Sequence, residues 1–192
     1  LTFISKGVKY TFKSPFLGVH NIENALAAFS IAVLQGVKPE IAIEALQDFK
    51  GVKRRAEFII NNEDLVFIDD YAHHPSEMKV LRDAVERQFV GKKVLGVFQP
   101  HLFSRTQDFV DDFRMELSRW EELILLDIYP AREEPIPGVT SDWLKEGIQT
   151  NITLVNLEKM VSEIQSRNFD VLVVFGAGSI GTKIVELKEV LS

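Results

Sequence analysis

Cysteine is absent from the 192-residue sequence, and this absence excludes disulfide bonds and metal sites built on thiolates. Positive charge is scarce, because 22 lysine and arginine residues stand against 28 aspartate and glutamate residues, for a net charge of −6. This balance argues against broad electrostatic binding to nucleic acid or to an anionic membrane, so we expect neither as a partner. An anionic ligand would need a few placed cations and backbone amides.

Long apolar runs and a targeting segment are also missing. No apolar run approaches the roughly 20 residues of a membrane-spanning helix. The N-terminal residues lack the charged-then-apolar order of a signal peptide. The lack of cysteine suits a reducing compartment, and we expect a cytoplasmic protein. Because the sequence opens in strand-like residues without an initiator methionine, we also expect it to be part of a longer chain.

The first 52 residues have a pattern of their own. Residues 1–16 predict two short strands joined around Lys6 and Gly7. Residues 21–36 have the helical period, and residues 38–49 predict a second helix. A basic, glycine-containing connector follows, and the change in composition and periodicity predicts a domain boundary near residues 51–53.

Beyond this boundary, apolar strand-like runs alternate with helical segments. Near-continuous apolar strands in such an alternation predict an α/β fold, a mostly parallel sheet with helices on both faces. The predicted strands are residues 57–61, 65–70, 93–100, 122–129, 151–155 and 170–176. The predicted helices are residues 76–89, 105–120, 141–150, 157–167 and 179–191.

Polar motifs stand at the ends of four predicted strands. They are DDYAHHP (69–75), QPHLFSRT (99–106), YPAREEPIPG (129–138) and GAGSIG (176–181). In α/β folds, ligands bind beyond the carboxyl ends of the parallel strands. We therefore expect these motifs to line one edge of the sheet and to form the functional site there.

The first motif concentrates Asp69, Asp70, His73 and His74 within six residues. Carboxylate and imidazole groups could ligate a divalent cation. Alternatively, the motif could shape a turn before a helix with Ser76 as its N-cap. A third possibility is hydrogen bonding to a ligand, since a carboxylate at a strand end suits the hydroxyls of a ribose.

The second motif places His101 and Arg105 where a helix is expected to begin, with Ser104 as its N-cap. A helix N-terminus attracts anions, and arginine adds a bidentate fork for carboxylate or phosphate. Because a lone cation is unfavourable at that helix end, we expect an anion nearby.

The GAGSIG motif matches G-x-G-x-x-G through Gly176, Gly178 and Gly181. A dinucleotide fingerprint also needs a further strand and an acidic residue about 20 residues on, but the sequence ends at Ser192. We therefore favour a glycine loop that lines the shared site.

Two further groups precede the α/β region. His20, Asn21 and Asn24 lie near the start of the first predicted helix, where Asn21 is an N-cap candidate and Asn24 could bind the edge of a planar base. Arg54 and Arg55 in the connector could clamp a phosphate or simply face solvent.

Taken in order, six motifs resemble the Mur ligases of peptidoglycan synthesis. They are GVHNIENALAA, GVKRRAEF, IDDYAHHPSE, VFQPHLFSRT, DIYPAREEPIPG and VVFGAGSIG. The resemblance covers nearly the whole chain and is strongest to the ligases that join L-alanine to UDP-N-acetylmuramate. It implies that residues 1–52 are the tail of a central ATPase domain and that residues 53–192 form a C-terminal Rossmann-like domain.

The resemblance also implies a reaction. In this family ATP activates a carboxylate as an acyl phosphate, and an amino group then displaces phosphate, with Mg²⁺ as cofactor. The implied partners are ATP, UDP-N-acetylmuramate, L-alanine and the missing N-terminal and central domains. No G-x-x-x-x-G-K-[ST] loop is present and the family's central magnesium ligands are not visible, so we expect this chain alone to be inactive.

Residue roles follow from the matching motifs. The resemblance implies that nucleotide contacts come from His20, Asn21, Asn24, one arginine of the Arg54–Arg55 pair, and Asp70 at the ribose. It implies that the amino-acid and muramoyl side is formed by His73, His74, His101 and Arg105, with Arg105 contacting a carboxylate or phosphate. Asp69 and Ser76 are expected to be structural. Leu102 stands where some relatives carry a second arginine, and it receives no role.

Three alternatives stay open. One is the recycling ligase that attaches a whole peptide to the same sugar nucleotide. Another is a metal-dependent phosphoesterase built on the Asp–His cluster. The third is a nucleotide-binding module without catalytic activity.

Overall fold

A computed structural model describes residues 2–5, 7–11 and 17–192. The chain divides into two compact units, Leu1–Val52 (unit 1) and Lys53–Ser192 (unit 2). Within the described ranges, no helix has the length and apolar character needed to cross a membrane.

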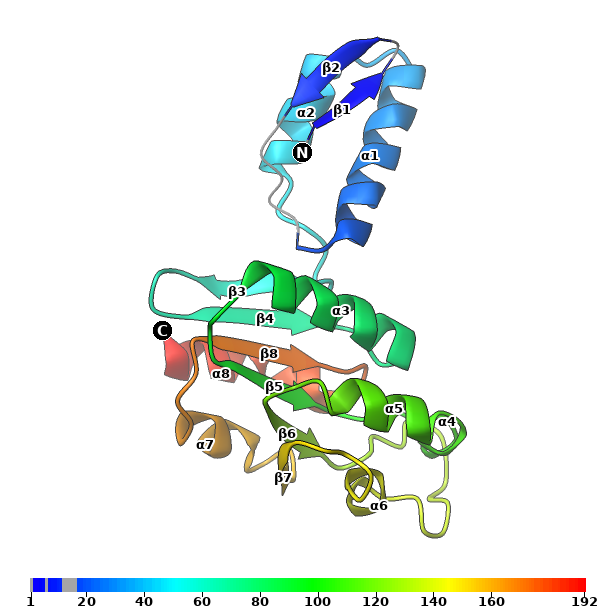
Figure 1. The fold of residues 1–192 in the computed structure, drawn as a ribbon, viewed down its shortest axis with the longest axis vertical. Coiled ribbons are helices and arrows are strands. Elements are labelled where there is room, and N and C mark those ends of the chain that lie inside the picture. The colour runs from blue at the N-terminus through cyan, green and yellow to red at the C-terminus, as the bar shows by residue number, and fades with distance from the viewer. Residues whose placement is uncertain (1, 6, 12–16) are drawn as a thin grey trace. The chain divides into compact units, whose positions relative to one another are not determined.

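Unit 1 consists of a strand hairpin and two helices (Figure 1). Strands β1 (Thr2–Ser5) and β2 (Val8–Thr11) pair antiparallel, and helices α1 (Val19–Leu34) and α2 (Pro39–Asp48) follow. Pro39 begins α2, where its missing N–H costs no helical hydrogen bond. The predicted hairpin and both predicted helices are confirmed, while residues 12–16 of the predicted second strand lie outside the described residues.

Much of the apolar surface of unit 1 is uncovered. A groove of about 350 Å³ between α1 and α2 is lined only by apolar side chains, among them Phe29, Val37 and Phe49. On α1, Ile31 is 62% exposed and Leu34 is 74% exposed. Unit 1 therefore has only a small core of its own.

Unit 2 is built on a six-stranded sheet with the order β3-β4-β8-β5-β6-β7. Its strands are β3 (Glu57–Asn61), β4 (Val66–Asp70), β5 (Val94–Phe98), β6 (Glu122–Leu126), β7 (Asn151–Val155) and β8 (Val171–Phe175). All neighbouring pairs are parallel except β3 and β4, which are antiparallel. The expected mostly parallel α/β fold is confirmed.

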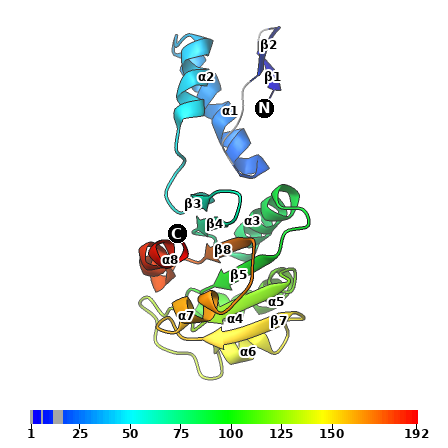
Figure 2. The same cartoon turned by 90° about the vertical axis from the view of Figure 1, so that its left-hand side faces the viewer.

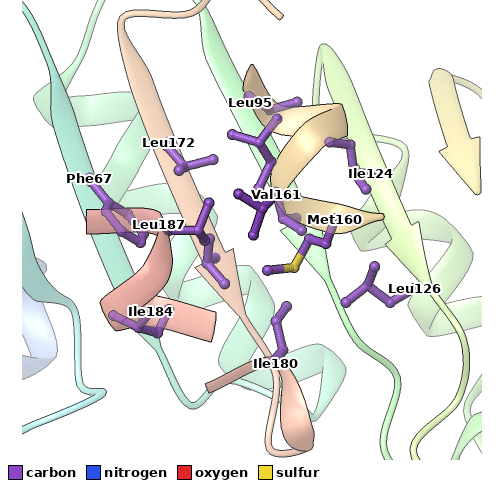
Figure 3. Packing of buried hydrophobic residues seen from close by; sticks show 13 residues of the cluster. Phe67, Leu95, Ile124, Leu126, Met160, Val161, Leu172, Ile180, Ile184 and Leu187 are labelled. Carbon is purple, nitrogen blue, oxygen red and sulfur yellow. The ribbon is translucent and has the colours of Figure 1, made fainter. Parts of the chain in front are cut away.

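Helices cover both faces of this sheet (Figure 2). On one face, α7 (Met160–Gln165) and α8 (Ile184–Leu191) pack against alternate strand residues, such as Leu172 and Val174 of β8 (Figure 3). On the other face, α3 (Pro75–Gln88) and α5 (Val110–Leu117) contact each other and cover a buried aromatic cluster that includes Phe98, Phe113 and Phe175. Burial on both faces explains why the strand sequences are apolar without alternation.

Four predicted helices differ from those observed, and the one expected over residues 157–167 is shorter, as α7. The helix expected over residues 105–120 is divided into α4 (Phe103–Asp108) and α5, because Phe109 departs from helical dihedral angles. The helix expected over residues 141–150 ends early, as α6 (Ser141–Lys145). The C-terminal helix begins as a 3₁₀ turn, η1 (Ser179–Lys183), before α8.

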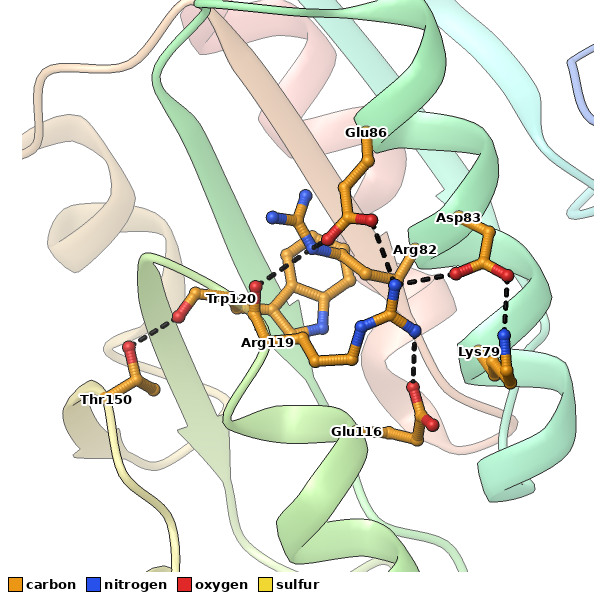
Figure 4. Close-up of polar contacts among 8 residues, drawn as sticks. All are labelled: Lys79, Arg82, Asp83, Glu86, Glu116, Arg119, Trp120 and Thr150. Atoms are coloured by element: carbon orange, nitrogen blue, oxygen red, sulfur yellow. Dashed lines mark hydrogen bonds and ion pairs between the residues drawn. The ribbon is translucent and has the colours of Figure 1, made fainter.

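An ion-pair cluster joins α3 to the end of α5 (Figure 4). Arg119 donates to Asp83 at 2.6 Å and to Glu86 and Glu116, each at 2.9 Å. Hydrogen bonds from Lys79 and Arg119 hold the pKa of Asp83 at about 2. The cluster therefore ties the two helices together beside the buried aromatic cluster.

Candidate functional site

The four polar motifs meet at the carboxyl edge of the sheet, as the parallel topology predicts. Gly176 N donates to Asp70 O at 3.2 Å, which joins the first motif to the last. Leu102 N donates to Tyr129 O at 2.9 Å, and Tyr129 N donates to Pro100 O at 2.8 Å. Ile180 N donates to Gln99 Oε1 at 2.8 Å, so the loops after β4, β5, β6 and β8 form one connected rim.

A row of four rings crosses this rim. The ring centroids of Tyr71 and His73 lie 5.3 Å apart, those of His73 and His101 5.9 Å, and those of His101 and Tyr129 5.7 Å. Sequence reasoning identified the histidines but missed Tyr71 and Tyr129, whose position within the motifs was the available signal. We call these four residues the aromatic row.

His101 is a neutral imidazole at the centre of the charged groups. Burial lowers the pKa of His101, and the nearby Arg105 guanidinium and His73 lower it further. Arg105 Nη1 lies 3.5 Å from His101 Nδ1. Because a guanidinium only donates, Nδ1 accepts and the His101 proton lies on Nε2.

His73 and His74 have different roles in the local structure. His73 Nδ1 donates to Tyr71 O at 2.9 Å and also lies 3.2 Å from Glu77 Oε2. His74 is the N-cap of α3, because its Nδ1 accepts from Ser76 N at 3.3 Å and Glu77 completes a capping box. The prediction of Ser76 as the N-cap was therefore wrong. Whether either histidine contacts a substrate stays a prediction.

The start of α4 carries its own anion. Glu133 Oε2 accepts from Ser104 N at 3.0 Å, and the Glu133 carboxylate also accepts from the Ser104 hydroxyl. These hydrogen bonds lower the pKa of Glu133. The N-cap of α4 is Leu102, at φ 71°, and not Ser104 as predicted. Glu133 is thus an anion of the protein itself at the start of α4, and an anionic ligand at Arg105 stays a prediction.

Asp70 is a bridging carboxylate at the end of β4. Its Oδ2 accepts from Ala56 N at 2.6 Å, and its Oδ1 accepts from Ala72 N at 2.7 Å. The residue is 8% exposed. A ribose contact, which stays a prediction, would share oxygens that already accept backbone hydrogen bonds.

Asp69 is the more deeply buried carboxylate of the pair, at 2% exposed. Its Oδ2 accepts from Arg54 Nε at 3.2 Å, while its Oδ1 is buried and has no hydrogen-bond partner among the described residues. Burial raises the pKa of Asp69 to about 6, against the opposing effect of Arg54. Desolvation thus outweighs the ion pair.

Replacing Asp69 with asparagine is expected to flatten the pH dependence of stability between about pH 4 and 6. Because folding raises the pKa of Asp69 from 3.8 to about 6, the folded state binds the proton more tightly. The wild type therefore loses stability as the pH rises through this window, by up to about 1.4 kcal/mol per pH unit. Urea unfolding across this range measures the effect.

A matched control for Asp69→Asn is Asp64→Asn, which removes an exposed carboxylate from the β3–β4 turn. The expected result is a shallower slope in Asp69→Asn than in both the wild type and the control. Equal slopes in all three proteins would contradict the prediction.

Each glycine of GAGSIG accommodates a neighbouring part of the protein. Gly176 has φ 138°, and a Cβ there would lie 2.6 Å from the Gln99 carbonyl oxygen. A Cβ at Gly178 would lie 2.7 Å from Tyr129 Cβ, and one at Gly181 would lie 2.7 Å from Arg54 Cζ. The glycine spacing is therefore explained by packing at the rim without a dinucleotide.

The site residues predicted in unit 1 lie in the first turns of α1. Asn21 Nδ2 donates to Leu17 O at 2.9 Å, and the helix begins after Gly18, so Asn21 is not the N-cap that the sequence suggested. Asn24 is exposed, and His20 Nδ1 is buried with no partner in the described part of the chain. A role for these three residues at a nucleotide stays a prediction.

Comparison with known proteins gives the family. Residues 54–178 match the model of the Mur ligase, glutamate ligase domain. A UDP-N-acetylmuramate–L-alanine ligase of Cytophaga hutchinsonii is 49% identical over 172 residues, which cover 89% of this chain and 37% of that protein. A ligase of the same name from Parabacteroides distasonis is 43% identical over 100% of this chain and 42% of its own length. The chain thus spans about two-fifths of the length of these curated relatives.

A solved structure supports the fold independently. The UDP-N-acetylmuramate–alanine ligase of Thermotoga maritima superimposes with a TM-score of 0.77 at 24% identity, over 96% of this chain and 40% of that one. All six strands of the unit 2 sheet lie within residues 54–178, the range that matches the family model. This chain belongs to the Mur ligase family.

Proposed function

We propose that this chain is the C-terminal part of an ATP-dependent ligase that joins L-alanine to UDP-N-acetylmuramate in peptidoglycan biosynthesis. The observation that carries the proposal is the 43% identity to a ligase of that name across the whole chain. Residues 1–52 would be the tail of the central ATP-binding domain, and residues 53–192 the C-terminal domain. Its soluble substrates and cell-wall role favour a cytoplasmic enzyme.

The proposed reaction has two steps. The γ-phosphate of ATP is transferred to the substrate carboxylate, which releases ADP and forms an acyl phosphate. The amino group of L-alanine then attacks the acyl carbon, the new amide bond forms, and inorganic phosphate leaves. Cations that offset the charge of the phosphoryl group and of the carboxylate would accelerate both steps.

The rim of unit 2 supplies groups suited to these steps. The half-buried Arg105 can offer its guanidinium fork to the carboxylate or to phosphate. The neutral His101 beside it has Nε2–H available as a hydrogen-bond donor. His73 adds a second imidazole, 5.9 Å from His101 between ring centroids. These groups would orient the acyl phosphate and the incoming amine.

Magnesium would neutralise charge on the ATP phosphates in this chemistry. Across residues 2–5, 7–11 and 17–192, no group of three or more histidine, aspartate or glutamate side chains is arranged to hold a metal ion. Asp70 and His74 are both engaged in local hydrogen bonds. As the family resemblance implies, the ligands of this magnesium ion would lie mainly outside this chain. The same contacts disfavour the metal-dependent phosphoesterase.

Phosphate release tests the proposal directly. We expect the 192-residue chain alone to release no phosphate from ATP with UDP-N-acetylmuramate and L-alanine, because it contains no P-loop. The full-length polypeptide should release phosphate only when L-alanine is present. Robust turnover by the isolated chain would refute its assignment as a fragment.

The same assay separates the remaining alternatives. A full-length protein that used a tripeptide and ignored free L-alanine would be the recycling ligase. A nucleotide-binding module would bind ATP measurably as the isolated chain and would show no ligase activity at full length. The identity to alanine-adding relatives favours L-alanine.

A further inference from the structure

The side chain of Arg54 bridges two strand ends of unit 2. Its Nε donates to Asp69 Oδ2 at 3.2 Å, at the end of β4. Its Nη2 donates to Gly176 O at 2.6 Å, directly after β8. Its Cζ also lies 5.0 Å from the centroid of the Tyr71 ring. One planar guanidinium therefore holds β4, the glycine loop and the first ring of the aromatic row together.

The backbone around Arg54 is fixed in a conformation that non-glycine residues rarely adopt. Arg54 has φ 58° and Ala56 has φ 49°. Arg54 N donates to Glu57 Oε2 at 2.9 Å, and Tyr71 N donates to Arg54 O at 2.7 Å. Such a conformation persists only where surrounding contacts impose it. These contacts therefore set the direction of the Arg54 side chain.

The glycine loop leaves room for this side chain. A Cβ at Gly181 would lie 2.7 Å from Arg54 Cζ and 2.8 Å from Nη1. A methyl group at residue 181 would therefore force the guanidinium to shift from its place. The adjacent Arg55 has no such enclosure: its side chain is 53% exposed, and its ion pair with Glu77 is 4.0 Å long.

We infer that Arg54 is a positioning residue that clamps the glycine loop to the end of β4 and thereby holds the rim in shape. The buried Asp69 carboxylate and the Gly176 carbonyl each accept from one of its N–H groups, so these two bonds fix the plane of the guanidinium between β4 and the glycine loop. Arg54 acts on a bound substrate through Tyr71 and the loop over residues 176–181. The catalytic part of this inference rests on the proposed function, whereas the clamp itself does not.

Amide hydrogen exchange of the 192-residue chain tests the clamp. We expect Arg54→Ala and Arg54→Lys to accelerate exchange in the loop over residues 176–181 by about tenfold or more, because a charge-assisted bridge is lost. Gly181→Ala should accelerate the same amides while Arg54 remains, because the new methyl group displaces the guanidinium. Arg55→Ala is the matched control and should leave the loop unchanged, and the amides of β7 serve as an internal reference.

Unchanged exchange in the loop in the Arg54 variants would overturn the inference, as would equal acceleration in β7. Kinetics of the full-length ligase give a second readout. A positioning role predicts that Arg54→Lys lowers kcat and leaves the KM for ATP within about twofold, since lysine keeps the charge but not the fork. A raised KM for ATP with an unchanged kcat would instead identify a phosphate ligand. If the wild type lacks alanine ligase activity, the proposed function fails while the exchange result still decides the clamp.

Discussion

Replacing Trp120 with alanine is expected to lower the free energy of unfolding of unit 2 by about 3–5 kcal/mol. Trp120 is 1% exposed, and its ring stacks on Phe175 with centroids 4.9 Å apart. Arg82 Cζ lies 5.0 Å from the Trp120 ring on the side of the ion-pair cluster (Figure 4). A Cβ at Gly96 would lie 2.6 Å from Trp120 Cε3, so the indole fills the space that this glycine leaves.

The loss would come from packing and from the contact of the ring with Arg82. The indole Nε1 of Trp120 has no hydrogen-bond partner among the residues that the structure describes, so the substitution removes no such bond. Alanine would leave a cavity between the sheet and the helices α3 and α5, which the surrounding structure can only partly close. Urea unfolding monitored by circular dichroism measures the change.

Trp143→Ala is the matched control, because it deletes the same side chain from a half-buried position. Trp143 contacts Arg114 through a cation–π interaction at 5.2 Å. We expect a clearly smaller loss of stability there. A loss below about 1 kcal/mol for Trp120→Ala, or equal losses in both variants, would contradict the packing argument.

Replacing Arg105 with alanine in the full-length ligase is expected to lower kcat/KM by about 10²–10³-fold. The guanidinium lies at the rim beside the neutral His101, where charge on an acyl phosphate would develop. Arg105→Lys should recover part of the loss, since it restores the charge without the bidentate geometry. Steady-state phosphate release with saturating ATP measures both variants.

Arg87→Ala is the control for Arg105→Ala, because Arg87 is an exposed residue in the last turn of α3. Its activity should equal that of the wild type. Equal activity of Arg105→Ala and the wild type would remove Arg105 from the site. An unfolded Arg105→Ala variant would be recognised by its circular dichroism, and Arg105→Lys would then carry the test.

The sequence predicted the sheet and its rim because their signals are local. Apolar runs such as residues 171–175 are buried on both faces, and polar motifs follow them directly. The division of residues 105–120 into two helices was not predictable in this way, because the Phe109 ring packs against His74, 4.6 Å away between centroids. That contact joins two motifs far apart in the sequence.

Helix starts were misjudged for a common reason. Asn21, Ser76 and Ser104 are typical N-cap residues, yet each lies inside the first turn. The actual N-caps are Gly18, His74 and Leu102. Two of these, Gly18 and Leu102, have positive φ, a backbone property that composition does not reveal.

The roles of the two carboxylates were equally hidden. Asp69 and Asp70 are adjacent and chemically identical, but one pairs with Arg54 and the other accepts backbone N–H groups. Their partners lie in the connector over residues 53–56 and in the turn at Ala72. Only the folded path of the connector brings these groups together, so residue type alone could not assign them.

The strand order of unit 2 has a consequence for how the chain folds during synthesis. The last strand, β8, lies between β4 and β5, which do not pair with each other. Within the sheet, the hairpin of β3 and β4 is therefore hydrogen-bonded to the strands β5, β6 and β7 only through residues 171–175. Until the ribosome has made residues 171–175, β4 and β5 each have one unpaired edge, which β8 later occupies. The rim that carries Asp70 and the glycine loop can form only after residues 171–181 have been made, and long-range pairing of this kind folds slowly.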